Sequence, residues 1–117
     1  AQLKLDIDFS MSDSRPIVAM FSNQGWKPKF LTNMMTIEDI KGKANIDMAD
    51  NRIVIPLAKA SGDTIEVDAK AVITEQNSNG MVYFRYKNFD ALLKIKDGKK
   101  NLDIIKPQEK YQAYTVE

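Results

Sequence analysis

The chain begins with a strict alternation of apolar and polar positions. Residues 3–11 read LKLDIDFSM, with Leu3, Leu5, Ile7, Phe9 and Met11 separated by single polar residues. A period of 2 places alternate side chains on opposite faces of a β-strand. The sequence therefore predicts a two-sided strand whose apolar side faces a protein core, a lipid or the strand of a partner.

The same period returns after Gly42 and continues almost to the end of the chain. Alternating segments are predicted at 43–48, 52–57, 65–73, 81–87, 89–95 and 102–105. Asp50-Asn51 and Asp97-Gly98 separate neighbouring segments as two-residue hairpin turns, because these residues accept the positive φ that such turns require. Pro56 lacks an N–H donor, so we expect it on an edge strand or at a strand end.

The end of the chain departs from this alternation. Pro107 is expected to stop the last strand, and residues 108–117 are polar apart from their tyrosines and suit a short helical turn or a loose strand. We therefore predict one all-β domain over residues 1–117: an antiparallel meander of seven or eight strands forming a sandwich, a barrel or a curled open sheet.

The apolar positions of this meander need cover from water. Burying one leucine-sized side chain stabilises a fold by about 1.5–3 kcal/mol, so closure of the sheet on itself is the default and an open groove needs a ligand or a partner. The expected inward-facing set is Leu5, Ile7, Phe9, Ile46, Ile53, Ile55, Ile65, Val67, Val82, Phe84, Leu93 and Ile95.

Composition narrows the chemistry. The 117 residues include 44% hydrophobic residues, enough for a core, and carry 17 basic against 16 acidic side chains, which argues against a general nucleic-acid binder. Histidine and cysteine are both absent, which removes the commonest general base, the thiol nucleophile and the usual zinc ligands. We expect a protein that is not an enzyme and that holds no metal and no cofactor.

The start of the chain bears on its location. Ala1-Gln2 is typical of a mature protein released by a signal peptidase, and a trimmed chain would begin in the same way. No run of about 18 apolar residues is present. A periplasmic or secreted location is expected, and the absence of cysteine fits the cytosol as well.

Two aromatic segments have both a functional and a structural interpretation. Residues 79–86, NGMVYFRY, partly match the strand of RNA-recognition modules whose rings stack on bases, and they also match an ordinary strand with Tyr83 on its outer face. Trp26 lies in a basic, turn-rich segment with Lys29 and Phe30; it suits sugar or base binding, or the closing of one end of the core.

The remaining clusters have simpler explanations. Lys94, Lys96, Lys99 and Lys100 surround the Asp97-Gly98 turn, where lysines discourage edge-to-edge pairing of sheets. Scattered aspartates and glutamates fit solvated strand faces better than a calcium loop. The six methionines show no short Met-x-Met spacing, so core filling or an adaptable apolar lining explains them better than copper binding.

The rhythm from Ile37 to Ile105 resembles the modules of the AsmA-like and TamB-like proteins of Gram-negative envelopes. The likeness is carried by IEDIKGKANIDMADNRIVIPLAKASGDTIEVDAKAVIT and GMVYFRYKNFDALLKIKDGKKNLDI, in which strands alternate with tight, often Gly-containing turns. The resemblance implies an incompletely closed β-groove that shields acyl chains, with no catalytic residue. The chain differs from that pattern by being short and by lacking a visible membrane anchor.

These observations predict an exported, non-enzymatic binding domain that holds an apolar ligand, a lipid or a partner protein on a curved sheet. The candidate ligand-binding side chains are Phe9, Met11, Trp26, Phe30, Met48 and Tyr83. Two alternatives remain: a carbohydrate- or nucleic-acid-binding module that uses Trp26 and Tyr83, and a structural subunit of a larger assembly.

Overall fold

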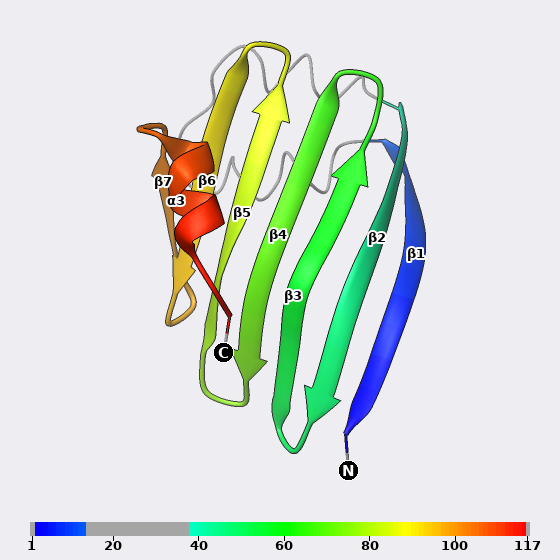
Figure 1. The fold of residues 1–117 in the computed structure, drawn as a ribbon, viewed down its shortest axis with the longest axis vertical. Helices are drawn as coiled ribbons and strands as arrows, with labels where there is room; N and C mark the ends of the chain where they lie inside the picture. The colour runs from blue at the N-terminus through cyan, green and yellow to red at the C-terminus, as the bar shows by residue number, and fades with distance from the viewer. Residues whose placement is uncertain (1, 14–37, 117) are drawn as a thin grey trace.

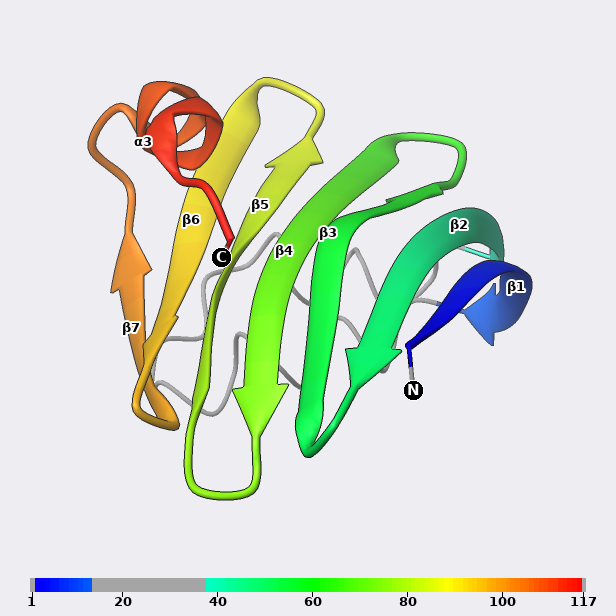
Figure 2. The ribbon, with the colours of Figure 1, turned by 60° about the horizontal axis from the view of Figure 1, so that its bottom comes forward.

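The fold is a single antiparallel sheet in which every strand pairs with its neighbours in sequence. The computed structural model describes residues 2–13 and 38–116, and the side chains of residues 2–10 and 39–116. In these ranges the strand order is β1-β2-β3-β4-β5-β6-β7, and the sheet is twisted, curved and open (Figures 1 and 2). The elements are β1 (Leu3–Asp13), β2 (Glu38–Ala49), β3 (Arg52–Ser61), β4 (Ile65–Thr74), β5 (Ser78–Tyr86), β6 (Phe89–Lys96), β7 (Lys99–Asp103) and α3 (Pro107–Ala113).

The predicted all-β meander is confirmed in its open form. β1 and β7 are the two edges of the described sheet, so within these residues the strands close into neither a barrel nor a sandwich. The expectation that closure is the default was therefore wrong for the described strands. A meander joined by short hairpins adds strands one at a time, and only pairing between its first and last strands would close it.

Residues with positive φ, in the left-handed region of backbone conformation, form the tight hairpin turns. Asp97 and Gly98, with φ values of 53° and 77°, join β6 to β7 as the sequence predicted. Asn51, with φ of 58°, lies in the two-residue turn between β2 and β3. Lys87, with φ of 53°, plays this part between β5 and β6, although lysine is not a typical residue for that conformation.

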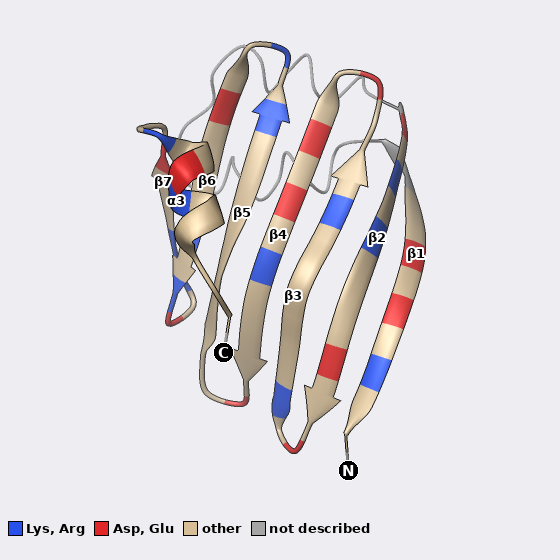
Figure 3. Ribbon diagram, viewed as in Figure 1, with Lys and Arg blue, Asp and Glu red and all other residues tan. Residues whose placement is uncertain are grey.

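The strand register segregates apolar and polar side chains on opposite faces. Directly paired residues of an antiparallel sheet project to the same side. One continuous row runs from Phe9 through Gly42, Ala60, Val67 and Phe84 to Ala91. The same pairing places the whole expected inward-facing set on this side, which we call the apolar face. The register places most of the charged strand residues on the opposite side, which we call the polar face. Figure 3 shows where the charged residues lie along each strand.

Pro56 lies inside β3, a strand with neighbours on both sides, and not at an edge or a strand end as predicted. The register between β3 and β4 shifts between Ile55 and Ala58, because β3 contains one more residue than β4 over this interval. Such a bulge leaves one residue outside the ladder, which is where a residue without an N–H donor is tolerated. The shift also keeps Ala58 on the apolar face together with Ile55.

The best-buried part of the apolar face lies on β5 and β6. Phe84, Ala91 and Leu93 are completely buried there, and they pack with Ile65 of β4 and Ile40 of β2. On the polar face, α3 covers the same two strands (Figure 1). Its Tyr111 packs with Tyr83, Leu92 and Met81 in a second, smaller cluster.

The C-terminal region shows one further difference from the sequence analysis, at the end of β7, and its tail takes the helical one of the two expected forms. β7 ends at Asp103, so Ile104 and Ile105 lie outside the strand and are 57% and 67% exposed. The tail forms the helix α3, with Pro107 in its first turn. Proline suits the first turn because its missing N–H would have no partner within the helix.

We predict that Gly80→Ala destabilises the fold by about 1–3 kcal/mol, because the added methyl group overpacks a closed site. Gly80 is buried on β5, and a Cβ at this position would overlap the carbonyl oxygen of Lys70 on β4. Urea unfolding followed by circular dichroism measures the change. Ser61→Ala, at an exposed site, is the control and should alter stability by less than about 0.5 kcal/mol. Equal stability of the two variants would contradict the close packing at Gly80.

Candidate functional site

A part of the apolar face on β1–β4 is only partly covered. Leu3 is 53% exposed, and Ile7 and Ile73 are each 39% exposed. Half-buried neighbours surround them on the same face of the sheet. We call this surface the apolar patch; it consists of Leu3, Leu5, Ile7, Ile46, Met48, Ile53, Ile55 and Ile73.

The patch continues the core without a polar boundary. Ile7 pairs with Ala44, and the row continues through Ala58 and Ala69 to the buried Val82. The small alanines keep this middle part of the face shallow. In the part of the chain that the structure describes, α3 is the helix that packs on the sheet, and it packs on the opposite face. The apolar patch is therefore the half of this face that the described elements leave open.

A shallow hollow of about 340 Å³ lies at one end of the patch. Met48, Ile53 and Ile73 form its apolar lining, and Arg52 and Glu75 add charged groups. A thioether side chain adapts its shape readily to what it contacts. The hollow therefore combines an adaptable apolar floor with polar groups, an arrangement that suits one end of an amphipathic molecule.

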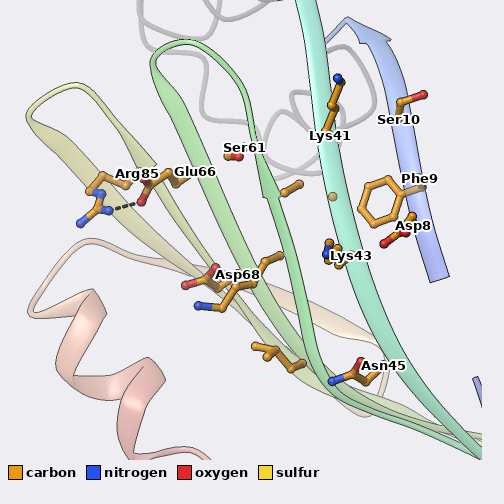
Figure 4. A pocket seen from close by; sticks show the side chains of 14 residues that line it. Asp8, Phe9, Ser10, Lys41, Lys43, Asn45, Ser61, Glu66, Asp68 and Arg85 are labelled. Carbon is orange, nitrogen blue, oxygen red and sulfur yellow. Dashed lines mark hydrogen bonds and ion pairs between the residues drawn. The ribbon is translucent and has the colours of Figure 1, made fainter. Parts of the chain in front are cut away.

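A larger hollow of about 1010 Å³ lies between β1 and β5 (Figure 4). Its lining is mostly side chains of the polar face, together with Phe9, Gly42 and Ala60 of the apolar face. One row of its side chains runs Asp8, Lys43, Lys59 and Asp68, each paired directly with the next across the sheet. Two lysines directly opposite each other repel, and an aspartate beside each one offsets the repulsion. This alternation of charge balances itself and does not direct the hollow toward one sign of ligand.

A second row of the same hollow includes the ion pair between Arg85 and Glu66 (Figure 4). Both side chains are about half exposed, so the pair contributes little to stability. Among the described residues, no group of three or more acidic side chains is arranged to hold a metal ion. The polar face is therefore a solvated, internally compensated surface.

Tyr83 lies on the polar face beneath α3 and not on the apolar patch. It is 6% exposed, its ring stacks on Tyr111 with centroids 5.8 Å apart, and its hydroxyl donates to Asp90 Oδ2 at 2.8 Å. Burial, followed by the hydrogen bond to Asp90, raises the pKa of Tyr83 to about 12. Intramolecular contacts therefore occupy the ring and the hydroxyl that the sequence analysis assigned to ligand binding.

α3 is fastened to the sheet by two polar contacts. Lys70 Nζ donates to the carbonyl oxygens of Tyr111 and Tyr114 at 3.1 and 3.0 Å, and it lies 4.3 Å from the centroid of the Tyr111 ring. A cation at a helix C-terminus satisfies carbonyls that have no partner within the helix. Burial of Tyr111 raises the pKa of its hydroxyl well above the ordinary value.

The second contact centres on Asp103, at the end of β7. Its carboxylate accepts hydrogen bonds from Lys110 Nζ at 2.6 Å, the backbone N–H of Ile105 at 2.8 Å and Lys94 Nζ at 2.9 Å. The bond from Lys110 first, then those from Ile105 and Lys94, hold the pKa of this carboxyl well below its usual range. The group joins β6, the chain after β7 and α3.

Of the predicted ligand-binding residues, the structure describes the side chains of Phe9, Met48 and Tyr83, and Tyr83 lies on the opposite face from the other two. Phe9 and Met48 lie on the apolar face, where the ring of Phe9 covers Gly42 and Met48 belongs to the patch. Met11 of β1 pairs with Ile40 of β2, and the side chain of Met11 lies outside the described residues. Trp26 and Phe30 also lie outside the described ranges 2–13 and 38–116.

The sequence analysis missed the polar contacts that hold α3. Lys70 and Tyr111 are 41 positions apart, and no local pattern connects them. Asp103 was likewise not identified, because its two lysine partners come from elements that only the fold brings together. The one available signal for a helix docked on the sheet was Tyr111, a large aromatic residue in a mostly polar tail.

Comparison with protein-family models, curated proteins and solved structures finds no match, so function is argued from the geometry of the chain itself. Across residues 2–13 and 38–116, no helix has the length and apolar character needed to cross a bilayer.

We predict that Asp103→Asn destabilises the protein at pH 7 and that this difference from the wild type narrows below about pH 4. A lowered pKa in the folded state means that the carboxylate stabilises the fold above its ordinary pKa, and that this contribution is lost as the pH falls. Urea unfolding at pH 7 and at pH 3 measures both differences. Asp63→Asn, at an exposed turn, is the control for the loss of charge. An Asp103→Asn effect of equal size at both pH values would contradict the proposed role of the ionised carboxylate.

Proposed function

We propose that this protein is a non-enzymatic binding domain that holds the hydrocarbon part of a lipid, or a similar apolar ligand, on the apolar patch of β1–β4. The observation that carries the proposal is the exposure of Leu3, Ile7 and Ile73 on a face that continues directly into the core. Contiguous exposed apolar surface marks interaction sites in soluble proteins. A ligand on the patch would extend the core over the open half of the sheet.

The energy available for such binding comes from water released from the patch. Full burial of one leucine- or isoleucine-sized side chain is worth about 1.5–3 kcal/mol. Leu3, Ile7 and Ile73 are partly buried already, so each would contribute a fraction of that amount. A flexible acyl chain could follow the curved face and contact several of these side chains at once.

The shape and chemistry of the hollow support an amphipathic ligand. Its floor of Met48, Ile53 and Ile73 is suited to methylene groups, and Arg52 beside it can donate several hydrogen bonds to an anionic head group. The resemblance in rhythm to envelope modules with β-grooves points to the same class of ligand. The chain has no histidine and no cysteine, which accords with a role in binding rather than in catalysis.

The carbohydrate- or nucleic-acid-binding alternative receives less support. It depends on Trp26, which lies outside the described residues, and on Tyr83, whose ring is stacked on Tyr111 beneath α3. Base and sugar stacking require an accessible ring face.

We predict that Ile73→Asp weakens the binding of oleate by about tenfold or more, because a carboxylate on the patch would lose water on contact with the acyl chain. Native mass spectrometry of the full chain with oleate measures the bound fraction. Asn45→Asp places the same charge on an exposed position of the polar face and should leave binding unchanged. Equal losses in both variants, or no binding of oleate by the wild type, would overturn the proposal.

We also predict that oleate slows the oxidation of Met48 by hydrogen peroxide and leaves the oxidation rate of Met81 unchanged. Both methionines are half-buried, but Met48 belongs to the patch and Met81 lies on the polar face beside Tyr83. Peptide mass spectrometry over a time course compares the two rates in one sample. Equal protection of both residues would indicate a general stabilisation of the fold and would contradict a ligand on the patch.

A further inference from the structure

β1 presents an open edge that differs from the other edge of the sheet. It is 11 residues long, whereas β7 at the opposite edge has 5. β7 carries Lys99 and Lys100, a common protection against further pairing, and α3 follows it closely in the chain. In the described part of the chain, β1 pairs with β2 along one edge, and no strand pairs with the other edge of β1 (Figure 2).

β1 carries charged side chains of both signs, Lys4 with Asp6 and Asp8, so a strand in a matching register can pair with them and not be repelled. Leu3–Asp13 contains neither proline nor glycine, and it pairs with β2 at constant register. Two of its apolar side chains are well exposed, Leu3 at 53% and Ile7 at 39%. A long, regular edge strand with one apolar side is a template for another strand.

We propose that β1 pairs antiparallel with β1 of a second copy of this chain, with Leu5 opposite Leu5 at the two-fold axis. In this register Lys4 lies opposite Asp6 of the second copy, and Asp6 lies opposite Lys4. The two sheets join edge to edge into one, and their apolar faces lie on the same side. Leu3 then lies opposite Ile7 of the second copy, so the exposed side chains of the two patches stand side by side on one continuous apolar face.

Charge selects this register among the symmetric ones that keep the apolar faces together. A register centred on Lys4 places two lysines opposite each other, and one centred on Asp6 does the same with two aspartates. A register centred on Ile7 places Asp6 opposite Asp8 twice. Only pairing centred on Leu5 makes two opposite-charge pairs without a like-charge pair, and cross-strand charge pairs of this kind favour or disfavour a register.

A charge exchange tests the proposal. Lys4→Asp and Asp6→Lys each turn two attractive pairs into repulsive ones, so each should weaken dimerisation by about tenfold, and the double variant should restore it. Sedimentation equilibrium of the full chain across a range of concentrations measures the dimer fraction. The control is Lys59→Asp, which makes the same change in net charge as Lys4→Asp but lies on β3, away from the edge. It should leave dimerisation unchanged.

A cysteine at the axis provides a second measurement. The chain contains no cysteine, so Leu5→Cys places one thiol in each copy, directly opposite the other in the proposed register. Mild oxidation should give a disulfide-linked dimer, and Lys59→Cys should not. A chain that stays monomeric at all concentrations overturns the proposal, as does a dimer that is insensitive to the charge exchange. A dimer that Ile73→Asp disrupts while the charge variants leave it intact would show face-to-face packing of the patches and would also overturn it.

Discussion

The structure depends on the register of its strands. In the seven antiparallel strands that the structure describes, the apolar positions must all project to the same face of the sheet. A slip of one residue in any strand would turn its apolar side chains to the polar face, so each hairpin must set the register of the next strand. β3 shows the constraint most clearly. Its apolar positions are Ile53 and Ile55 and then Ala58 and Ala60, which are out of phase in the sequence, and the bulge at Pro56 brings both pairs to the same face.

The two faces of the sheet are covered from solvent in different ways. The polar face of β5 and β6 is covered by α3 through Tyr111, and polar contacts at Lys70 and Asp103 fix its position. The apolar face is densely packed around Phe84, Ile65 and Ile40, and it is more exposed at Leu3, Ile7 and Ile73. The sheet therefore has a part on β5 and β6 where both faces are buried, and a part where the apolar side chains Leu3, Ile7 and Ile73 stay exposed.

Charge is distributed so that most of it is compensated locally. The net charge of +1 arises from nearly equal numbers of acidic and basic residues, and the register places many of them next to opposite charges. Lys43 and Lys59 stand between Asp8 and Asp68, and Asp103 joins two lysines. With the polar face balanced in this way, the proposed binding at the patch would be driven mainly by the hydrophobic effect.

The sequence by itself determined the strand class, the Asp97-Gly98 hairpin and which side chains share a face within each uninterrupted alternating segment, because period 2 and turn chemistry are local properties. Tertiary structure decided what those local rules leave free. The sheet stays open within the described residues, Pro56 sits at an interior bulge, and Tyr83 is covered by a helix whose contacts span 41 positions. Of the expected binding residues, Phe9 and Met48 lie on the apolar face, but the exposure that defines the patch depends on how far neighbouring strands cover each residue, which no local pattern encodes.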